Sequence, residues 1–434
     1  MEKKEILKTI IKEFHTKQLP DFIKREINIP VDTNKIISIV GARRAGKTYA
    51  FYQIINELLS KGVPKESIIY INFEDERLDI TIGELDLILQ SYRELYPTIN
   101  ISETYLFFDE IQNINGWEKY IRRIYDSVTK KIFITGSNSK MLSEEISTSL
   151  RGRTLTYFIY PLSFKEFLRF KKFSFVMPTD LYDSAKKAML INLFAEYFIF
   201  GGFPEVVFLR EELKTKTLQE YFNVMIFKDL VERYKIRDVF VIKCLLKRFF
   251  ENIARTISIN KIFNELKSQG FKISKDSLYD YTEYAKNILL ISLVKRHYKS
   301  ILKSELAEKK LYVIDNGLVK AVRITGEDER GILLENLIYN NLIRLENTEI
   351  RYFKEKKECD FVLENKTTNI IQVCYSISNK DTTKREILSL IEACKYFKVK
   401  NGYIITFDEK QNFTQEGTNI YVIPAYEFLL NQNI

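Results

Sequence analysis

The stretch GARRAGKT carries the residues whose types and spacing point most directly to chemistry. Gly41, Gly46, Lys47 and Thr48 fit the pattern G-x-x-x-x-G-K-[ST]. The glycines let backbone N–H groups surround phosphates, the lysine reaches the β- and γ-phosphates, and the threonine hydroxyl holds Mg²⁺. The sequence therefore predicts a site for ATP and Mg²⁺, with these binding residues: Gly41, Ala42, Arg43, Arg44, Ala45, Gly46, Lys47, Thr48 and Tyr49.

An acidic pair, Asp109 and Glu110, ends the apolar run TYLFFDE. A P-loop sheet places its Mg²⁺-ordering aspartate and water-polarising glutamate at the carboxyl end of such a buried strand. Alone, the pair could be a surface turn, but downstream of a P-loop and one extra strand the functional interpretation is favoured. We predict that Asp109 and Thr48 hold the metal and that Glu110 is the general base for hydrolysis.

Two further places allow two interpretations each. Ser137 and Asn138 follow the predicted strand KKIFITG, where a polar residue either senses the γ-phosphate and orients water or caps a helix. Arg151 and Arg153 flank Gly152, and they are either arginine fingers for a neighbouring subunit's nucleotide or ordinary surface charges. The finger interpretation is favoured only in a ring or filament. The candidate catalytic residues are thus Lys47, Glu110, Asn138, Arg151 and Arg153.

A parallel sheet is needed to position these residues. The run KIISIV is rich in β-branched residues and precedes the glycine loop, and an amphipathic helix follows the loop and ends at Gly62. Further strands are predicted within SIIYINFEDE, TYLFFDEIQ and KKIFITGSNSK, and a fifth after Arg153. These elements predict an α/β fold with a P-loop at its N-terminal half.

The middle of the chain is predicted to be helical. Residues from about Leu181 to Asp238 have a helical pattern interrupted by FGGFPEVV, a turn that is either a hinge or lid element or, as we favour, structural. A helix from about Asn260 to Gly270, a second from about Ser274 and a β-rich stretch are typical of a winged helix.

Two functions are open for this winged-helix pattern. Its β-rich stretch carries Lys295, Arg296, His297 and Lys299, which suit phosphate contacts. Its second helix, however, carries Asp276, Asp280 and Glu283, which make a poor reader of a DNA groove. The module therefore either contacts DNA or serves as a lid or interdomain contact.

The segment ECDFVLENKTTNIIQVCYS predicts two strands joined by a polar turn, with Asp360, Gln372 and Cys374 on one face. A metal-dependent nuclease hairpin looks similar but has a carboxylate at the position of Gln372 and a lysine at that of Cys374. An amide carbonyl is a weaker Mg²⁺ ligand, and a thiol neither suits Mg²⁺ nor supplies positive charge. Either Lys354, Lys356 or Lys357 compensates, or, as we favour, Gln372 and Cys374 merely fill a half-buried sheet face.

Several motifs in order resemble a large family of prokaryotic, archaeal-type AAA+ ATPases. They are GARRAGKT, FFDEIQNINGWEKYIRRIYD, ITGSNSKML, LRGR, YPLSFKEF, FGGFPEVV, KDLVERYKIRD and KLYVIDNGL. The resemblance covers nearly the whole chain and implies a C-terminal domain of unknown function similar to a degenerate restriction-endonuclease fold, with Glu335, Asp360, Gln372 and Cys374 at its site positions. It also implies packing and orienting roles for Trp117 and Gln112.

The expected architecture is an α/β chain of four segments. These are an AAA+-type P-loop core at 1–170, a helical lid or linker at 171–239, a winged-helix-like domain at 240–308 and a restriction-endonuclease-like domain, inactive as a nuclease, at 309–434.

Composition excludes several other classes. Four cysteines without a CxxC pair and two histidines argue against structural zinc and against a disulfide framework. The start MEKKEILKTIIKEF has no long apolar region, and YFIFGGFPEVVF is too interrupted to span a bilayer. We expect a cytoplasmic protein without a membrane partner. The net charge of +9 permits nucleic-acid contact without establishing it.

Three functions follow from these patterns. The first is an Mg²⁺-dependent ATPase, expected to form a homo-oligomer, whose nucleotide cycle switches modules that bind a partner, with DNA as one candidate. The second is an ATP-regulated nuclease acting on DNA. The third is a non-catalytic signalling or interaction switch that binds ATP.

Overall fold

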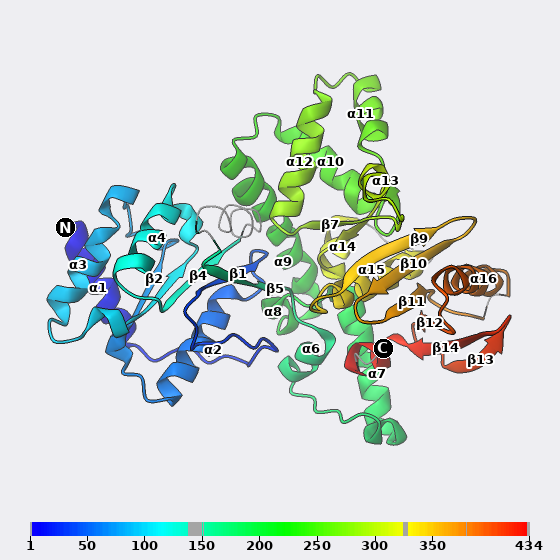
Figure 1. Ribbon diagram of the computed structural model, residues 1–434, viewed down its shortest axis with the longest axis horizontal. Helices are drawn as coiled ribbons and strands as arrows, with labels where there is room; N and C mark the ends of the chain where they lie inside the picture. Colours follow the sequence, from blue (N-terminus) through cyan, green and yellow to red (C-terminus); the bar gives the residue numbers. More distant parts are fainter. Residues whose placement is uncertain (1, 138–149, 151, 324–328, 379, 432–434) are drawn as a thin grey trace. The chain divides into compact units, whose positions relative to one another are not determined.

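The computed structural model describes residues 2–137, 150, 152–323, 329–378 and 380–431, and the chain divides into two compact units (Figure 1). The first unit comprises Met1–Tyr160 with Asn287–Leu289, and the second comprises Pro161–Lys286 with Leu290–Ile434. Each unit builds sheets of its own. No helix in the described part of the chain is long and apolar enough to cross a membrane.

A five-stranded parallel sheet forms the centre of the first unit, in the order β2-β3-β4-β1-β5. Its strands are β1 (Ile36–Gly41), β2 (Ile68–Asn72), β3 (Tyr105–Asp109), β4 (Ile132–Gly136) and β5 (Thr154–Ile159). The strands β1, β3 and β4 are buried along their whole length, as expected for a parallel sheet covered on both faces. All five predicted strands are confirmed, and β4 lies between β1 and β3.

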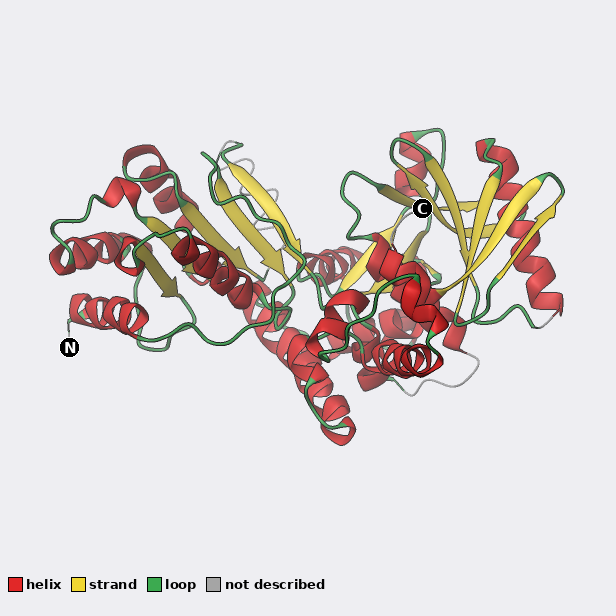
Figure 2. Cartoon of the chain, turned by 90° about the horizontal axis from the view of Figure 1, so that it is seen from below, coloured by secondary structure: helices red, strands yellow, loops and turns green. Residues whose placement is uncertain are grey.

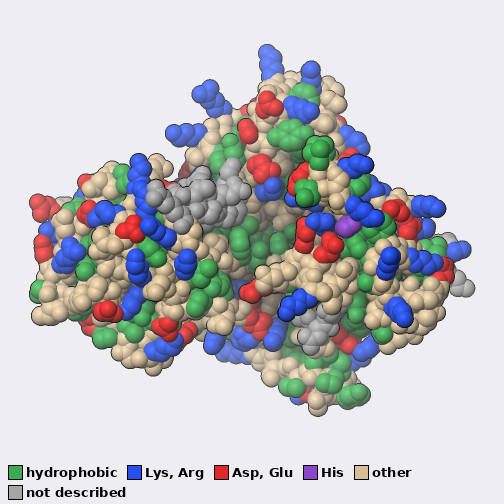
Figure 3. Space-filling model, in the orientation of Figure 1, with side chains coloured by type: hydrophobic (Ala, Val, Ile, Leu, Met, Phe, Trp, Pro, Cys, Tyr) green, Lys and Arg blue, Asp and Glu red, His purple; other side chains and the backbone are tan. Residues whose placement is uncertain are grey.

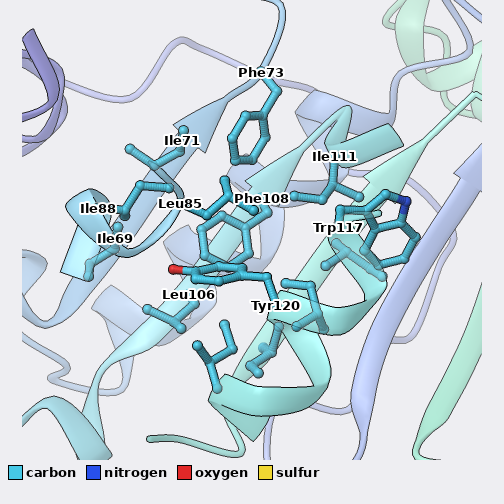
Figure 4. Packing of buried hydrophobic residues seen from close by; sticks show 14 of the residues in the cluster. Ile69, Ile71, Phe73, Leu85, Ile88, Leu106, Phe108, Ile111, Trp117 and Tyr120 are labelled. Carbon is cyan, nitrogen blue, oxygen red and sulfur yellow. The ribbon is translucent and has the colours of Figure 1, made fainter. Parts of the chain in front are cut away.

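Helices cover this sheet (Figure 2). They are α1 (Lys3–Thr16), α2 (Lys47–Ser60), α3 (Asp86–Leu95) and α4 (Trp117–Ser127), with the 3₁₀ turns η1 (Lys65–Ser67), η2 (Ile82–Glu84), η3 (Ile101–Glu103) and η4 (Ile111–Asn113). In α4 the buried residues Trp117, Tyr120, Ile121 and Ile124 recur at helical spacing, so one face of the helix packs on the sheet. Figure 4 shows Phe108 of β3 in the resulting cluster, with its ring centroid 6.2 Å from that of Tyr120.

The second unit begins with helices, as predicted for the middle of the chain. They are α6 (Phe164–Phe170), η5 (Thr179–Tyr182), α7 (Ser184–Phe200), α8 (Pro204–Val207), α9 (Glu211–Val224), the π-helical segment η6 (Met225–Glu232) and α10 (Val239–Glu251).

The FGGFPEVV turn has a structural role in this unit. Gly201 has φ 70°, and a Cβ there would lie 1.9 Å from Oδ1 of Asp315. The N–H of Gly202 donates to Oδ2 of Asp315 (2.7 Å), and the N–H of Gly317 donates to Oδ1 (2.8 Å). A buried carboxylate therefore ties the end of α7 to the motif VIDNGL.

A small antiparallel sheet follows, in the order β6-β8-β7. Its elements are β6 (Thr256–Ile257), α11 (Ile259–Ser268), α12 (Lys275–Asn287), β7 (Ile291–Val294), α13 (Ile301–Leu306) and β8 (Lys309–Val313). The two helices predicted from about Asn260 and Ser274 are confirmed. The strand β8 begins the predicted segment 309–434 but pairs with β6 and β7 of the segment before it.

A six-stranded mixed sheet completes the chain, in the order β13-β14-β12-β11-β10-β9 (Figures 1 and 2). Its strands are β9 (Glu349–Lys354), β10 (Glu358–Glu364), β11 (Thr368–Val373), β12 (Asn401–Thr406), β13 (Gln411–Gln415) and β14 (Thr418–Pro424). The helices of this region are α14 (Asn316–Val322), α15 (Arg330–Leu342), α16 (Lys380–Phe397) and α17 (Ala425–Asn431). A helix, three strands, a helix and a strand follow one another from α15 to β12, and the antiparallel hairpin of β13 with β14 comes after them.

Candidate functional site

The GARRAGKT loop connects β1 to the N-terminus of α2. Gly41 must be glycine because a Cβ there would lie 2.4 Å from the carbonyl oxygen of Ile159 on the neighbouring strand. Arg44 (φ 65°) and Gly46 (φ 102°) have left-handed backbone conformations, which curl the loop before the helix begins. The first N–H groups of α2 have no partner within the helix, so this end of the helix offers donors and a partial positive charge to an anion.

The other loop residues support this shape. Ala42 and Ala45 are fully buried, whereas Tyr49 is exposed. The guanidinium of Arg43 forms an ion pair with Glu74 (2.8 Å). Buried Arg25, which the sequence did not single out, donates to the carbonyl oxygen of Ala45 (2.8 Å) and so holds the loop from behind.

Lys47 lies inside the loop and is only 4% exposed. Its ammonium donates to the carbonyl oxygens of Gly41 (3.2 Å) and Ala42 (3.3 Å) and forms an ion pair with Oε1 of Glu110 (3.0 Å). Lys47 and Glu110 are 63 residues apart in the sequence, and the fold brings them into one site. This meeting of Lys47 and Glu110 is what the predicted chemistry requires.

Asp109 ends β3 at the same edge of the sheet and is fully buried. Its Oδ2 accepts hydrogen bonds from the hydroxyls of Thr48 (2.8 Å) and Tyr70 (2.9 Å), and its Oδ1 accepts one from Thr135. Burial and then the neighbouring charge of Glu110 raise the pKa of Asp109, against these three hydrogen bonds. The two predicted metal ligands, Thr48 and Asp109, are therefore in direct contact.

Glu110 has a left-handed backbone (φ 52°) and its N–H donates to the hydroxyl of Thr135 (2.9 Å). Its Oε2 accepts a hydrogen bond from the side-chain amide of Gln112 (2.5 Å). Burial would raise the pKa of Glu110, but the Lys47 ammonium and the Gln112 hydrogen bond outweigh burial and hold the pKa below its ordinary value. The orienting role predicted for Gln112 and the packing role predicted for Trp117, which is fully buried, are confirmed.

The remaining predicted catalytic residues have different outcomes. Asn138 and Arg151 lie outside the described residues, and their roles stay predictions. Ser137 is buried, with its hydroxyl 3.5 Å from the Gln112 amide nitrogen. Arg153 forms an ion pair with Asp126 (2.9 Å), as expected for a surface charge, and its role toward a neighbouring subunit stays a prediction.

Sequence reasoning missed Tyr70 and Thr135, which both contact Asp109. Tyr70 lies on β2, two residues before the end of the strand, and Thr135 lies on β4, two residues before Ser137. A tyrosine or threonine inside an apolar strand has no motif of its own. Only the register of the sheet brings these hydroxyls to the aspartate.

A second cluster of buried charges lies in the second unit around Lys310 of β8. The Lys310 ammonium contacts carboxylate oxygens of Asp360 (2.8 Å), Glu335 (2.9 Å) and Glu358 (3.0 Å), and the lysine is 1% exposed. Glu335 also accepts a hydrogen bond from the hydroxyl of Tyr312 (2.6 Å). The structure thus brings the predicted pair Glu335 and Asp360 together, but around a lysine that the sequence did not single out.

The surrounding carboxylates favour the charged form of this lysine. Burial would lower the pKa of Lys310, but the charges of Asp360 and Glu335 raise it well above its ordinary value. Burial and the charge of Asp360 raise the pKa of Glu335. A divalent cation at this point would have to displace an ammonium that already contacts all three carboxylates.

Asp360 reaches the cluster through an irregularity in its strand. The pairing of β10 with β9 shifts register between Cys359 and Val362, so two residues there lie opposite one, as in a β-bulge. Oδ1 of Asp360 contacts Lys310, and its Oδ2 accepts a hydrogen bond from the N–H of Val373 (2.9 Å).

Gln372 and Cys374 serve the sheet rather than Lys310. Gln372 accepts a hydrogen bond from the N–H of Asp360 (3.3 Å) and donates to Glu386 of α16 (2.6 Å). Burial raises the pKa of the Cys374 thiol to about 12, and this cysteine packs in the apolar cluster beneath α16. The thiol is therefore neutral and supplies no charge.

The alternative that we did not favour, in which a lysine just before the hairpin compensates, finds no support in the contacts of Lys354, Lys356 and Lys357. Lys354 is exposed and pairs with Glu358 (3.2 Å), and Lys356 is exposed with its backbone N–H bonded to Glu392. The N–H of Lys357 also faces Glu392 (3.4 Å). The strand β8 supplies the cation instead. Lys310 and Tyr312 are two residues apart on β8, so both side chains lie on the face of the strand toward α15.

The first unit has the α/β fold of an AAA-type P-loop domain, with a parallel sheet, the GARRAGKT loop after β1 and an acidic pair at the end of β3. The family described as AAA domain matches residues 33–168. Two domains of unknown function match the rest, DUF8612 at residues 191–329 and DUF4143 at residues 330–428.

Relatives match along nearly the full chain. The chain is 40% identical over 421 residues to the uncharacterised protein MJ1544 of Methanocaldococcus jannaschii, a match that covers 94% of this chain and 91% of that protein. It therefore belongs to the same family as MJ1544. It is also 29% identical over 377 residues to an uncharacterised protein of Haemophilus influenzae, with 86% and 90% of the two chains covered.

A solved structure also matches, the Orc1 protein of Aeropyrum pernix in complex with DNA. The match has 13% identity and a TM-score of 0.32 and covers 74% of this chain and 91% of that one. A likeness this distant carries no conclusion about function.

Proposed function

We propose that this protein is an Mg²⁺-dependent ATPase whose nucleotide cycle switches the C-terminal modules that bind a partner. The observation that carries the proposal is the joint placement of Lys47, Thr48, Asp109 and Glu110 at one edge of the sheet. Four residue types with complementary roles in phosphoryl transfer meet there, although they come from two separate motifs.

The residues present fit ATP and Mg²⁺. The left-handed loop and the N-terminus of α2 offer N–H donors to phosphates, and Lys47 offers a buried ammonium. Thr48 and Asp109 offer hard oxygen ligands of the kind that Mg²⁺ prefers. When bound, Mg²⁺ neutralises the charge that develops on the transferred phosphoryl group.

The protein's own residues prepare the attacking water. The phosphate oxygens of a bound nucleotide compete with the Glu110 carboxylate for the Lys47 ammonium. Nucleotide binding therefore weakens the ion pair between Lys47 and Glu110 and leaves the carboxylate available to water. Gln112 and Thr135 keep Glu110 in place while this happens, through its carboxylate and its backbone N–H. Glu110 then takes a proton from the attacking water as the general base.

An ATPase assay tests the proposal. Glu110→Gln should lower kcat by about 10²–10⁴-fold while ATP still binds, because only the general base is lost. Lys47→Ala should lose both ATP binding and turnover. Lys61→Ala, an exposed lysine at the end of the same helix, is the matched control and should behave like wild type. Normal hydrolysis by Glu110→Gln or Lys47→Ala would refute the mechanism.

The segment from α10 to β8 supports a winged-helix assignment, since α11 and α12 lie in the chain between β6 and β7 of an antiparallel sheet of the order β6-β8-β7. The exposed face of α12 carries Asp276, Asp280 and Glu283, so this helix is a weak groove reader, as expected. Figure 3 shows basic and acidic side chains interspersed on the visible face. DNA as partner is therefore best tested by measuring the ATPase rate with and without single- and double-stranded DNA. The mass of the protein in solution, measured under the same conditions, tests whether it forms a homo-oligomer. Only in such an oligomer could Arg151 or Arg153 act on the nucleotide of a neighbouring subunit.

We further propose that the C-terminal sheet has a restriction-endonuclease-like arrangement that does not cut DNA. The elements α15-β9-β10-β11-α16-β12 support the arrangement, and Lys310 at the centre of Glu335, Glu358 and Asp360 supports the loss of cutting. Incubation with plasmid and single-stranded DNA in Mg²⁺ or Mn²⁺ should give no cleavage above that of Asp360→Ala. Cleavage that depends on Asp360 would instead establish the ATP-regulated nuclease.

A further inference from the structure

Tyr70 of β2 reaches the carboxylate of Asp109 from a strand that carries no nucleotide-binding motif. Its hydroxyl donates to Oδ2 of Asp109 (2.9 Å), the same oxygen that accepts a hydrogen bond from the Thr48 hydroxyl (2.8 Å). An ionised carboxylate only accepts hydrogen bonds, so both hydroxyls direct their protons at this oxygen. Neither phosphate binding nor proton abstraction from water uses the Tyr70 hydroxyl, so any role that it has in the site acts through Asp109.

The register of the sheet places Tyr70 beside this aspartate. In the parallel pairing of β2 with β3, the residue opposite Asp109 is Asn72, two positions after Tyr70. Alternate residues of a strand return to the same face, so Tyr70 and Asp109 share one face of the sheet. The contact between them runs diagonally from strand to strand, a reach that suits a long aromatic side chain.

Two helices hold the ring of Tyr70 in place. Its centroid lies 5.4 Å from that of Phe14 on α1 and 5.9 Å from that of Tyr52 on α2. Aromatic rings at such separations pack favourably, and the packing restricts the rotamers open to the side chain. The Tyr70 hydroxyl is therefore a donor whose position is fixed before any ligand binds.

Thr135 of β4 holds the other oxygen of the same carboxylate. Its hydroxyl donates to Oδ1 of Asp109 and accepts a hydrogen bond from the N–H of Glu110 (2.9 Å). Strands β2 and β4 are the two neighbours of β3 in the sheet, so Tyr70 and Thr135 hold Asp109 from opposite sides. Together they keep Oδ2 of the carboxylate turned toward Thr48.

The donors to Asp109 suit a carboxylate that binds a metal. The three hydroxyls that donate to it are neutral, so they orient the carboxylate without cancelling its charge. Asp360 is the opposite case, because the Lys310 ammonium contacts it and already supplies a positive charge. Carboxylates that ligate a metal are themselves held by hydrogen bonds, and loss of such a partner typically costs about 10–100-fold in metal affinity.

We propose that Tyr70, together with Thr135, is a positioning residue for the Mg²⁺ that accompanies the nucleotide. Tyr70 acts by keeping the Asp109 carboxylate oriented toward Thr48. Because Asp109 and Thr48 belong to the nucleotide site, this role rests on the proposed function. A tyrosine that merely completed the core would leave the affinity for the metal unchanged when its hydroxyl is removed.

Nucleotide affinity with and without metal separates these two roles. A non-hydrolysable ATP analogue is titrated into the full-length protein by calorimetry, once in Mg²⁺ and once in EDTA, and the ratio of the two affinities gives the contribution of the metal. Tyr70→Phe removes one oxygen atom and should reduce this ratio by about 10- to 100-fold, while the affinity in EDTA stays at the wild-type value. The Mg²⁺ concentration that half-saturates ATP hydrolysis should rise in the same variant.

Two further comparisons control for the loss of a buried hydroxyl. Tyr92→Phe is the matched control, because Tyr92 is fully buried in the same unit and donates to the carbonyl oxygen of Glu66 (2.6 Å), outside the site. It should leave the ratio unchanged. Thr135→Val should reduce the ratio, whereas Thr135→Ser, which keeps a hydroxyl, should keep it near the wild-type value. The two Thr135 variants also decide the question if Tyr70→Phe does not fold.

The failures of the two proposals are distinguishable. No binding by wild type in either condition would overturn the ATPase proposal and the positioning role together. Equal binding by wild type in Mg²⁺ and in EDTA would overturn the Mg²⁺ dependence and, with it, the positioning role. A metal-dependent ratio in wild type that Tyr70→Phe retains, as Tyr92→Phe does, would overturn the positioning role alone. So would an equal loss of affinity in Mg²⁺ and in EDTA for Tyr70→Phe, because the hydroxyl would then only support the fold.

Discussion

Replacing Lys310 by methionine removes the ammonium from the centre of Glu335, Glu358 and Asp360 while keeping a side chain of similar length. The lysine is 1% exposed and all three oxygens lie within 3.0 Å of its nitrogen, so no water takes its place readily. Removing one partner of a buried ion pair costs about 3–5 kcal/mol because the remaining charge is left uncompensated. That loss is a large part of the roughly 5–15 kcal/mol that stabilises a typical domain.

The penalty of Lys310→Met should depend on pH with a definite sign. Without the ammonium, Glu335 is left beside the charge of Asp360 in a buried place, so the folded-state pKa of Glu335, which is already raised in wild type, rises further above the unfolded value. A carboxyl with a raised pKa binds its proton more tightly in the folded chain, so the variant regains stability relative to wild type as the pH falls from 8 to 5.

Urea unfolding at pH 5 and pH 8 measures both effects. Lys309→Met is the matched control, because that neighbouring lysine pairs with Glu305 only at 3.7 Å and near the surface, where a pair contributes about 0–1 kcal/mol. Mn²⁺ should raise the unfolding midpoint of Lys310→Met, whose three carboxylates are free to take a cation, and leave that of wild type unchanged. If Lys310→Met is as stable as Lys309→Met and equally indifferent to Mn²⁺, the ammonium does not hold this cluster together.

Three other outcomes are expected. Gly201→Ala should lower the Tm by several degrees, since φ is positive and the Cβ would meet Asp315, whereas Gly331→Ala, with open space around it, should be neutral in the same thermal scan. Gln112→Ala removes a hydrogen bond that lowers the pKa of Glu110, so the acidic limb of the pH profile of ATP hydrolysis should move to higher pH. Burial raises the pKa of Asp315 to about 7, so wild type should lose more stability than Asp315→Asn in urea unfolding as the pH rises from 5 to 8, by about 2–3 kcal/mol. Equal losses would contradict this.

The nucleotide site was largely predictable because its chemistry is local. The loop from Gly41 to Thr48 must curl within eight residues, so its glycines, lysine and threonine stand at fixed spacing. The acidic pair was recognisable because a buried strand that ends in two carboxylates is costly unless they have partners. Those partners, Tyr70 and Thr135, were not predictable, because they reach Asp109 across strands rather than along them.

The C-terminal cluster shows the opposite case. The hairpin pattern identified Asp360, and the family resemblance identified Glu335, but sequence reasoning did not single out Lys310. Lys310 lies 50 residues before Asp360, on a strand that pairs in a different sheet. No spacing rule connects the two positions.

The sequence by itself determined the alternating elements, the phosphate loop and its helix, the acidic strand end and the two helices α11 and α12. Each of these follows from backbone geometry and burial over a few residues. Tertiary structure alone decided which strand lies beside which, and therefore that Lys47 meets Glu110, that Tyr70 meets Asp109 and that Lys310 fills the centre of three carboxylates. Those contacts depend on strand order and register, which pack residues from distant positions and leave no periodic trace in the chain.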